Sequence, residues 1–191
     1  MCVLPFLRVT ISEISIQNIV ASTSLGIELN LNDLAIKLNG AEYEPESFPG
    51  LIFRIKSPKS ATLLFRSGKI VCTGAKTLEQ VEKAIATTVA SIKEAGVPVA
   101  KNPKYDVQNI VASADLGQEI NLNAIAVSLG LDRVEYEPEQ FPGLVYRVSS
   151  PKVVLLLFGS GKLVCTGAKT EADAELAVIN VRKELSSLKL L

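Results

Sequence analysis

The chain of 191 residues contains the same sequence unit twice. Residues 17–39 match residues 108–130 at 14 of 23 positions, and residues 42–77 match residues 135–170 at 26 of 36 positions. Two copies of roughly 90 residues are too few and too long for a solenoid, whose repeats span about 20–50 residues. The duplication instead predicts two similar halves related by a pseudo-two-fold axis.

Each copy contains the same order of predicted elements. In the first copy a strand at 17–22 precedes a short helix, for which Asn30 is a favoured N-cap, as Asn121 is in the second. Short strands follow. Thr77 and Gln80 have the spacing of a capping box before a long amphipathic helix, and Thr170 opens the equivalent helix in the second copy. This order predicts an α+β fold with one continuous antiparallel sheet and helices on one face only. The short strands are expected at 51–55, 62–65 and 70–73, the first repeat at 8–96, the connector at 97–104 and the second repeat at 105–188.

Composition excludes several classes of protein. Apolar residues make up 48% and charged residues 21%, which is typical of a folded chain and argues against disordered, collagen-like and low-complexity proteins. Twenty basic residues balance twenty acidic ones, so the net charge gives no sign of a nucleic-acid partner. Three cysteines and no histidine argue against a metal site, and we expect no cofactor and a reducing cytosol. The longest apolar run, 153–158, is far shorter than the ~20 residues of a membrane span.

Alternation along the strands gives the predicted sheet two different faces. Ile19, Leu64 and Cys72 fall on one apolar face, which we expect the helices to cover. Their neighbours along the strands fall on the other face, which is also largely apolar, and the second copy repeats this pattern. Such a surface indicates a binding partner, although a second layer of the same protein or a homodimer would also cover it.

Basic residues gather in the strand region of each copy. Residues 47–78 include six basic residues and no acidic one, and residues 140–170 include four basic residues and no acidic one. The neutral total therefore hides two basic regions that suit phosphate groups. Lysines that protect strand edges would explain some of these charges, but not the absence of acids from both copies.

Three motifs recur in both copies: Gln-Asn-Ile-Val-Ala, Glu-Tyr-Glu-Pro-Glu-x-Phe-Pro-Gly-Leu and Phe-x-Ser-Gly-Lys-x-Val-Cys-Thr-Gly-Ala-Lys. With these motifs the chain resembles the TATA-box-binding protein family over residues 10–188. The resemblance implies a saddle, in which a curved, ten-stranded antiparallel sheet carries helices on its convex face only and holds DNA under its concave face. Phe-Pro-Gly-Leu in both copies and the lack of a long N-terminal extension look more like an archaeal member. We therefore expect a cytoplasmic, nucleoid-associated protein, or a nuclear one if the source is eukaryotic.

The resemblance also implies a role for individual residues. It implies a non-enzymatic general transcription initiation factor that binds the A·T-rich TATA box in the minor groove of double-stranded promoter DNA and bends it. The intercalating side chains would be Phe48, Phe65, Phe141 and Phe158. The base-contacting side chains would be Asn18, Asn109, Val20, Val111, Leu63, Leu156, Val71, Val164, Thr73 and Thr166. The phosphate-contacting side chains would be Arg54, Lys69, Lys76, Arg147, Lys162 and Lys169.

Protein partners follow from the same resemblance. Glu137 and Glu139 match the surface that binds transcription factor B, which in turn brings RNA polymerase into the preinitiation complex. The next residue is Gln140, where the family pattern leads us to expect leucine. A homodimer is a further expected state of the protein without DNA.

Two other hypotheses compete with DNA binding. A duplicated interaction module would use its apolar face for another protein, and salt-sensitive, A·T-selective duplex binding would exclude it. A hydrolase on a similar scaffold is a weaker hypothesis, because Cys72 and Cys165 are expected on the helix-covered face. Gly74-Ala-Lys-Thr77 lacks the spacing of a phosphate-binding loop.

Overall fold

The computed structural model describes residues 14–99, 103–130 and 132–191. The first six residues of the predicted first repeat, 8–13, and residues 100–102 of the predicted connector lie outside the described residues. Within the described ranges the chain forms ten strands and four helices, and the order strand, helix, four strands, helix occurs twice. The duplication in the sequence is thus a duplication of structure.

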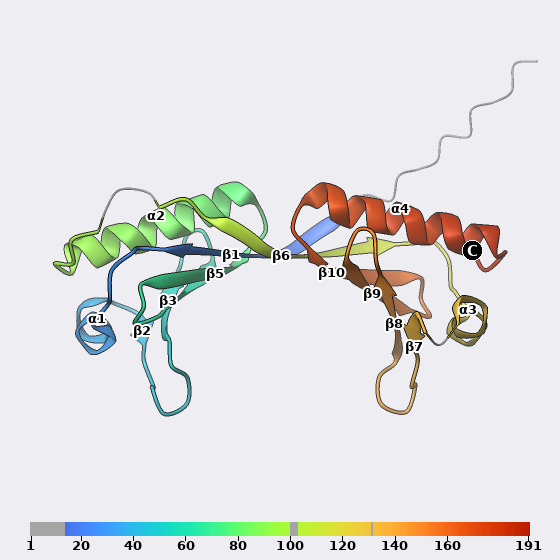
Figure 1. The fold of residues 1–191 in the computed structure, drawn as a ribbon, viewed down its shortest axis with the longest axis horizontal. Helices are drawn as coiled ribbons and strands as arrows, with labels where there is room; N and C mark the ends of the chain where they lie inside the picture. The colour runs from blue at the N-terminus through green and yellow to red at the C-terminus, as the bar shows by residue number, and fades with distance from the viewer. Residues whose placement is uncertain (1–13, 100–102, 131) are drawn as a thin grey trace, which may run out of the picture. The chain divides into compact units, whose positions relative to one another are not determined.

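The elements are labelled in chain order in Figure 1. The first repeat contains β1 (Ser15–Ser24), α1 (Leu31–Lys37), β2 (Ala41–Glu42), β3 (Leu51–Ile55), β4 (Ser60–Leu64), β5 (Lys69–Ala75) and α2 (Leu78–Glu94). The second contains β6 (Asp106–Asp115), α3 (Leu122–Leu129), β7 (Val134–Glu135), β8 (Gly143–Val148), β9 (Val153–Phe158), β10 (Lys162–Ala168) and α4 (Glu171–Ser187).

The strands form one ten-stranded sheet with the hydrogen-bonded order β2-β3-β4-β5-β1-β6-β10-β9-β8-β7. Neighbouring strands of the first repeat are antiparallel, and β4 and β5 form the hairpin that the sequence predicts. Phe65 lies in the turn of this hairpin, where its N–H donates to the carbonyl oxygen of Lys69 at 2.9 Å. The predicted α+β class with a ten-stranded antiparallel sheet is confirmed.

The chain divides into two compact units that cut across the repeats. The first, called the β1 unit, comprises the described residues of Ile16–Ala112 together with Thr166–Glu171. The second, called the α4 unit, comprises the described residues of Met1–Ser15, Ser113–Cys165 and Ala172–Leu191. Most of β6 and the end of β10 therefore belong to the β1 unit.

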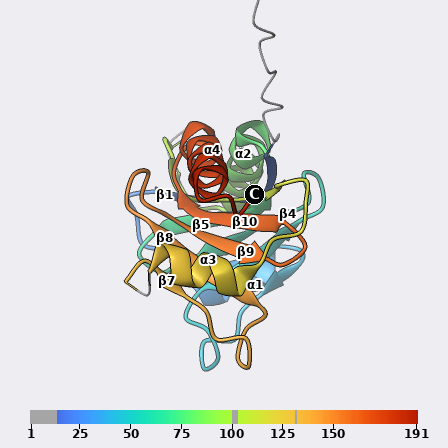
Figure 2. The same cartoon turned by 90° about the vertical axis from the view of Figure 1, so that its right-hand side faces the viewer.

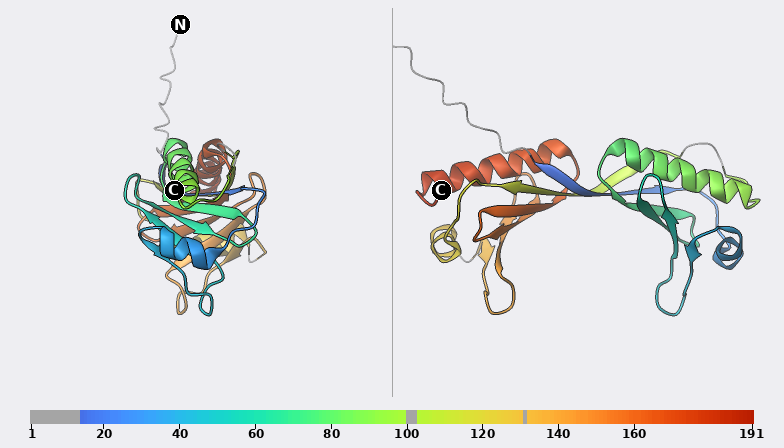
Figure 3. Two further views of the ribbon diagram at one scale, coloured as in Figure 1. Left: turned by 90° about the vertical axis from the view of Figure 1, so that its left-hand side faces the viewer. Right: turned by 180° about the vertical axis from the view of Figure 1, so that it is seen from behind.

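In the β1 unit, α2 lies along one side of the strands (Figure 3). One apolar side of this helix packs on β3, β4 and β5, as its predicted spacing requires. Ile19, Leu64, Ile70 and Cys72 from the strands are completely buried. The buried side chains of α2 are Val81, Ala84, Ile85, Thr88, Val89 and Ile92.

In the α4 unit, α4 lies on one side of the strands of that unit (Figure 2). Leu155, Leu157, Leu163 and Cys165 are fully or almost fully buried, in the same alternation as in the first repeat. The buried side chains of α4 are Ala174, Ala177, Val178, Val181 and Leu185. Among the described residues of each unit, this helix lies on one face of the strands only, and the opposite face is called the uncovered face.

The predicted starts of α1, α2 and α3 are confirmed by their capping geometry. The side chain of Asn30 accepts a hydrogen bond from the backbone N–H of Asp33, and Asn121 caps α3 in the same way. At α2, Thr77 accepts from the N–H of Gln80, but the Gln80 side chain accepts from the N–H of Lys76. The capping box predicted from the spacing is therefore shifted by one residue on its return side.

Candidate nucleic-acid interface

The uncovered face of the β1 unit carries the residues that the sequence places there. Along β1, Asn18 and Val20 are partly exposed, while Ile19 between them is completely buried. The register pairs Leu63 of β4 with Val71 of β5, so these two side chains share the same face. The predicted base-contacting residues of this unit are all partly exposed: Asn18, Val20, Leu63, Val71, Thr73, Asn109, Val111 and Thr166.

The α4 unit shows the same alternation. Leu156 on β9 and Val164 on β10 are partly exposed, and their chain neighbours Leu155, Leu157, Leu163 and Cys165 are buried. Phe158 ends β9 and is also partly exposed. The alternation therefore presents apolar side chains to solvent in both units, as the sequence predicts.

The four predicted intercalating phenylalanines form two matching pairs. In the β1 unit, Phe48 from the β2–β3 connection meets Phe65 edge to face, with ring centroids 5.9 Å apart and planes at 67°. In the α4 unit, Phe141 and Phe158 have the same separation and angle. Edge-to-face packing is favourable for aromatic rings, so each pair forms a preorganised apolar tip.

A glycine provides the space for each phenylalanine pair. A Cβ on Gly50 would lie 2.7 Å from Phe48 Cε1 and 3.1 Å from Phe65 Cε1. A Cβ on Gly143 would lie 2.7 Å from Phe141 Cε1 and 3.1 Å from Phe158 Cε1. The glycine of each Phe-Pro-Gly motif is therefore a part of the site that sequence reasoning missed. The motif itself was the available signal, since any larger residue there would displace the rings.

The two central asparagines have a fixed orientation. The backbone N–H of Gly74 donates to Asn18 Oδ1 at 2.7 Å, and Asn18 Nδ2 donates to Thr73 Oγ1 at 3.1 Å. In the second copy, the N–H of Gly167 donates to Asn109 Oδ1 at 2.7 Å, and Asn109 Nδ2 donates to Thr166 Oγ1 at 3.2 Å. A backbone N–H can only donate, so each carboxamide must turn its oxygen towards the glycine N–H. The NH₂ group keeps one further proton for an outside acceptor.

The predicted phosphate-contacting arginines are already paired with glutamates. Arg54 Nε and Nη2 donate to the two carboxylate oxygens of Glu42 at 3.2 and 3.3 Å. Arg147 Nη2 donates to the two oxygens of Glu135 at 3.0 and 3.2 Å. The hydrogen bond and positive charge of Arg54 lower the pKa of Glu42, and the same carboxylate raises the pKa of Arg54.

The four predicted phosphate-contacting lysines are exposed. Lys76 Nζ donates to Gln17 Oε1 at 3.4 Å. A hollow of about 590 Å³ in the β1 unit brings Asn18, Thr73 and Arg54 together with two further cations, Lys56 and Lys59. The exposed lysines are Lys69, Lys76, Lys162 and Lys169.

The predicted protein-binding glutamates lie on an exposed connection of the α4 unit. Glu137 and Glu139 are exposed, and the N–H of Phe141 donates to the carbonyl oxygen of Glu137 at 3.0 Å. Gln140, at the position expected to be leucine, is exposed as well. Glu137 and Glu139 thus lie on the same connection as Phe141, a few residues before it in the chain.

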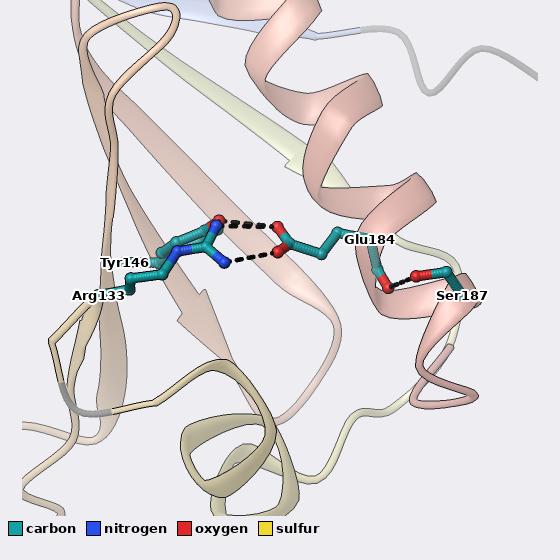
Figure 4. A network of polar contacts seen from close by, with 4 residues as sticks. All are labelled: Arg133, Tyr146, Glu184 and Ser187. Atoms are coloured by element: carbon teal, nitrogen blue, oxygen red, sulfur yellow. Dashed lines mark hydrogen bonds and ion pairs between the residues drawn. The ribbon is translucent and has the colours of Figure 1, made fainter.

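A polar network fixes the strands that carry this connection (Figure 4). Arg133, just before β7, donates to Glu184 of α4 at 2.9 Å and lies 5.2 Å from the ring centroid of Tyr146. The Tyr146 hydroxyl donates to the same Glu184 carboxylate at 2.7 Å. Burial, followed by the hydrogen bond and charge of Glu184, raises the pKa of Tyr146 to about 12. Sequence reasoning missed this network, because its members are far apart in the chain.

The two cysteines of the described residues belong to the core. Cys72 and Cys165 are completely buried, as predicted, and burial raises the pKa of each thiol to about 11. Cys2 lies outside the described residues. The described ranges contain no group of three histidine, cysteine, aspartate or glutamate residues placed to hold a metal ion. Every helix in the same ranges is too short or too polar to span a membrane.

Comparisons with known proteins agree with the geometry. The family model described as transcription factor TFIID, or TATA-binding protein, matches residues 13–95 and 104–188. The TATA-box-binding protein of Thermoplasma acidophilum is 59% identical over 179 residues, which cover 94% of this chain and 97% of that protein. The corresponding protein of Picrophilus torridus is 60% identical over 179 residues, with the same coverage of both chains.

A solved structure shows the same likeness. The Methanococcus jannaschii TATA-binding protein superposes with a TM-score of 0.83 at 52% sequence identity, and covers 92% of this chain and 99% of its own. The sequence match, the repeated architecture and the structural likeness lead to one conclusion: this chain belongs to the TATA-binding protein family of transcription factors.

Proposed function

We propose that the protein is a general transcription initiation factor that binds the TATA box of a promoter in the DNA minor groove and bends it. The observation that carries this proposal is the pair of oriented asparagines. Asn18 and Asn109 each present an NH₂ donor on a partly exposed, largely apolar strand face, and a backbone N–H fixes the direction of each.

The donors match the acceptors of A·T pairs. In the minor groove, A·T and T·A pairs both present adenine N3 and thymine O2, which accept hydrogen bonds from an amide NH₂ group. The apolar neighbours Val20, Val71 and Leu63 provide no acceptor for the guanine N2 amino group. A G·C pair against this face would lose the hydrogen bonds that this amino group makes in water, so the face favours A·T pairs.

The phenylalanine pairs supply the bending. An apolar ring that enters between two base pairs unstacks them and kinks the duplex away from the protein. Phe48 with Phe65, and Phe141 with Phe158, already pack edge to face beside their glycines, which would limit the conformational entropy lost on insertion. The unstacking energy is offset by the additional contacts that a bent duplex makes with the sheet.

The exposed cations would hold the DNA backbone. Lysine and arginine neutralise phosphates and release counterions, which gives affinity without base specificity. Lys69 and Lys76 in the first copy and Lys162 and Lys169 in the second suit this role, because all four are exposed. Arg54 and Arg147 would join them after leaving their glutamate partners.

The acidic connection would recruit the next factor. Glu137 and Glu139 are exposed on a connection whose flanking strands are fixed by Arg133, Tyr146 and Glu184. We assign this connection to transcription factor B, through which RNA polymerase would join the promoter. A basic surface on that factor would match the two carboxylates.

The test is energy transfer between the ends of a doubly labelled duplex that contains a TATA-type element, titrated with the protein. A duplex of G·C pairs alone is the control, and both are measured across a salt series. The proposal predicts bending of the A·T-rich duplex only, with an affinity that falls steeply with salt. Absence of bending in either duplex would contradict it and would favour a protein partner for the apolar face.

A further inference from the structure

The two arginine–glutamate pairs lie on the face proposed to meet DNA. Strand register pairs Glu42 with Ile52, Arg54 with Ala61, and Ala61 in turn with Thr73. Side chains at paired positions share a face of a sheet, and positions two residues apart in a strand do so too. Glu42 and Arg54 therefore share their face with Thr73, the partner of Asn18.

The second copy repeats this arrangement independently. Register pairs Glu135 with Val145, and Arg147 with Val154, which is two residues before Leu156 on β9. Again the carboxylate lies beside the arginine on the uncovered face, and it accepts two hydrogen bonds from it. Each of these glutamates lies on a two-residue strand, β2 or β7, which precedes the basic region in the sequence. Strand pairing places its carboxylate beside an arginine of that region.

We propose that Glu42 and Glu135 are internal competitors for the DNA phosphates, which occupy Arg54 and Arg147 until a phosphate displaces them. This inference rests on the proposed function. A carboxylate and a phosphate oxygen use the same guanidinium N–H groups. A carboxylate that stayed in place would also set two anions side by side on the bound DNA.

Displacement is feasible because both pairs are open to water. The side chains of Arg54 and Glu42 are 62% and 58% exposed, and those of Arg147 and Glu135 are 60% and 64% exposed. Exposed ion pairs contribute little to stability, so an arginine exchanges its partner at small cost. The two glutamates consequently lower the affinity for any polyanion without being required for the fold.

The experiment compares Glu42→Gln with Glu46→Gln. Glu46 is an exposed carboxylate on the β2–β3 connection that follows Glu42, and the described residues show no ion pair for it. Both variants therefore lose one negative charge. Affinity for the A·T-rich duplex is measured across a salt series. We expect Glu42→Gln to tighten binding about fivefold, the equivalent of an exposed ion pair, and to steepen the salt dependence by about one counterion. Glu46→Gln should change affinity less than twofold.

A double-mutant cycle identifies the partner. In an Arg54→Gln background, Glu42→Gln should no longer tighten binding, because no guanidinium is left to release. Equal or weaker binding by Glu42→Gln than by Glu46→Gln would overturn the proposal and would make Glu42 a positioning residue for Arg54. A gain that persists without Arg54 would also overturn it, since the effect would then be net charge alone.

A second measurement separates this inference from the proposed function. Binding to heparin, a polyanion without base pairs, is followed by the salt concentration that elutes each variant. Later elution of Glu42→Gln than of Glu46→Gln supports internal competition even if the A·T-rich duplex is not recognised. Elution of the two variants at the same salt concentration contradicts internal competition even if the duplex is bound and bent.

Discussion

Phe158 and Leu157 are neighbours on β9 that face opposite sides of the sheet. Leu157 is completely buried, whereas Phe158 is partly exposed and touches Phe141 edge to face at 5.9 Å. If the protein bends DNA as proposed, replacing each with alanine should separate folding from bending within two adjacent positions.

The expected costs follow from this geometry. Leu157→Ala removes a fully buried side chain, which costs about 2–5 kcal/mol of unfolding free energy. A fully buried phenylalanine would cost ~3–5 kcal/mol, but Phe158 is partly exposed, and its aromatic pair contributes about 0.5–1.5 kcal/mol. We expect Phe158→Ala to cost about 1–2.5 kcal/mol in total, and less than Leu157→Ala in the same protein.

Bending should show the opposite order. Urea denaturation gives the unfolding free energy of each variant, and energy transfer across a doubly labelled A·T-rich duplex gives the bend at saturation. Phe158→Ala should reduce the bend clearly, because one apolar wedge is lost. Leu157→Ala should bend DNA normally at temperatures where it is folded. A Phe158→Ala protein that is less stable than Leu157→Ala and bends DNA like the wild type would refute the assignment of Phe158 as a wedge.

Four further predictions concern other parts of the molecule. Asn109→Asp keeps the acceptor for the Gly167 N–H but replaces the donor with a charge, so binding to A·T-rich DNA should weaken by at least ~1–3 kcal/mol with unchanged melting; unchanged affinity in a titration would exclude Asn109 from base contact. Gly143→Ala should reduce bending with little loss of stability, because a Cβ displaces the Phe141 ring; circular dichroism and energy transfer measure the two effects, and normal bending would count against the glycine seat. Glu139→Arg should leave DNA binding intact and weaken the ternary complex with transcription factor B in a gel-shift assay, and an unaltered ternary complex would remove it from that surface. Tyr146 has its pKa raised to about 12 in the folded state, so its stabilising contribution is complete below the unfolded-state pKa of about 10 and is lost as the pH rises towards 12. Urea denaturation should therefore show that Tyr146→Phe loses less unfolding free energy than the wild type between pH 10 and pH 12. Some loss remains in the variant, because the raised pKa values of Cys72 and Cys165 also destabilise the folded state at alkaline pH. Identical pH profiles of the two proteins would contradict this prediction.

Much of the fold follows from short-range patterns in the sequence. Alternation along a strand is a local property, and it correctly separated buried Cys72 from partly exposed Val71 and Thr73. The helix starts at Asn30 and Asn121 follow from capping chemistry, which also depends on a few neighbouring residues. Both copies of the repeat show the same patterns, which reduces the chance of a coincidental pattern.

Features that depend on register or on distant residues did not follow from the sequence. Glu42 meets Arg54 only because β2 pairs with β3 in one register, and a shift of one residue would turn the glutamate to the other face. Glu184 reaches Tyr146 and Arg133 from a helix that is 38 or 51 residues away in the chain. The basic character of the strand regions was correctly inferred, but the carboxylates that neutralise part of it lie outside those regions in the sequence.

The proposed function requires this protein to read the minor groove of A·T-rich DNA. The most direct measurement replaces the A·T pairs of the TATA-type element with inosine·cytosine pairs, which resemble G·C in the major groove but lack the minor-groove N2 amino group. Because Asn18 and Asn109 would meet only minor-groove acceptors, we predict that the inosine duplex is bound and bent like the A·T duplex, whereas the G·C duplex is not. Rejection of the inosine duplex together with the G·C duplex would contradict minor-groove recognition.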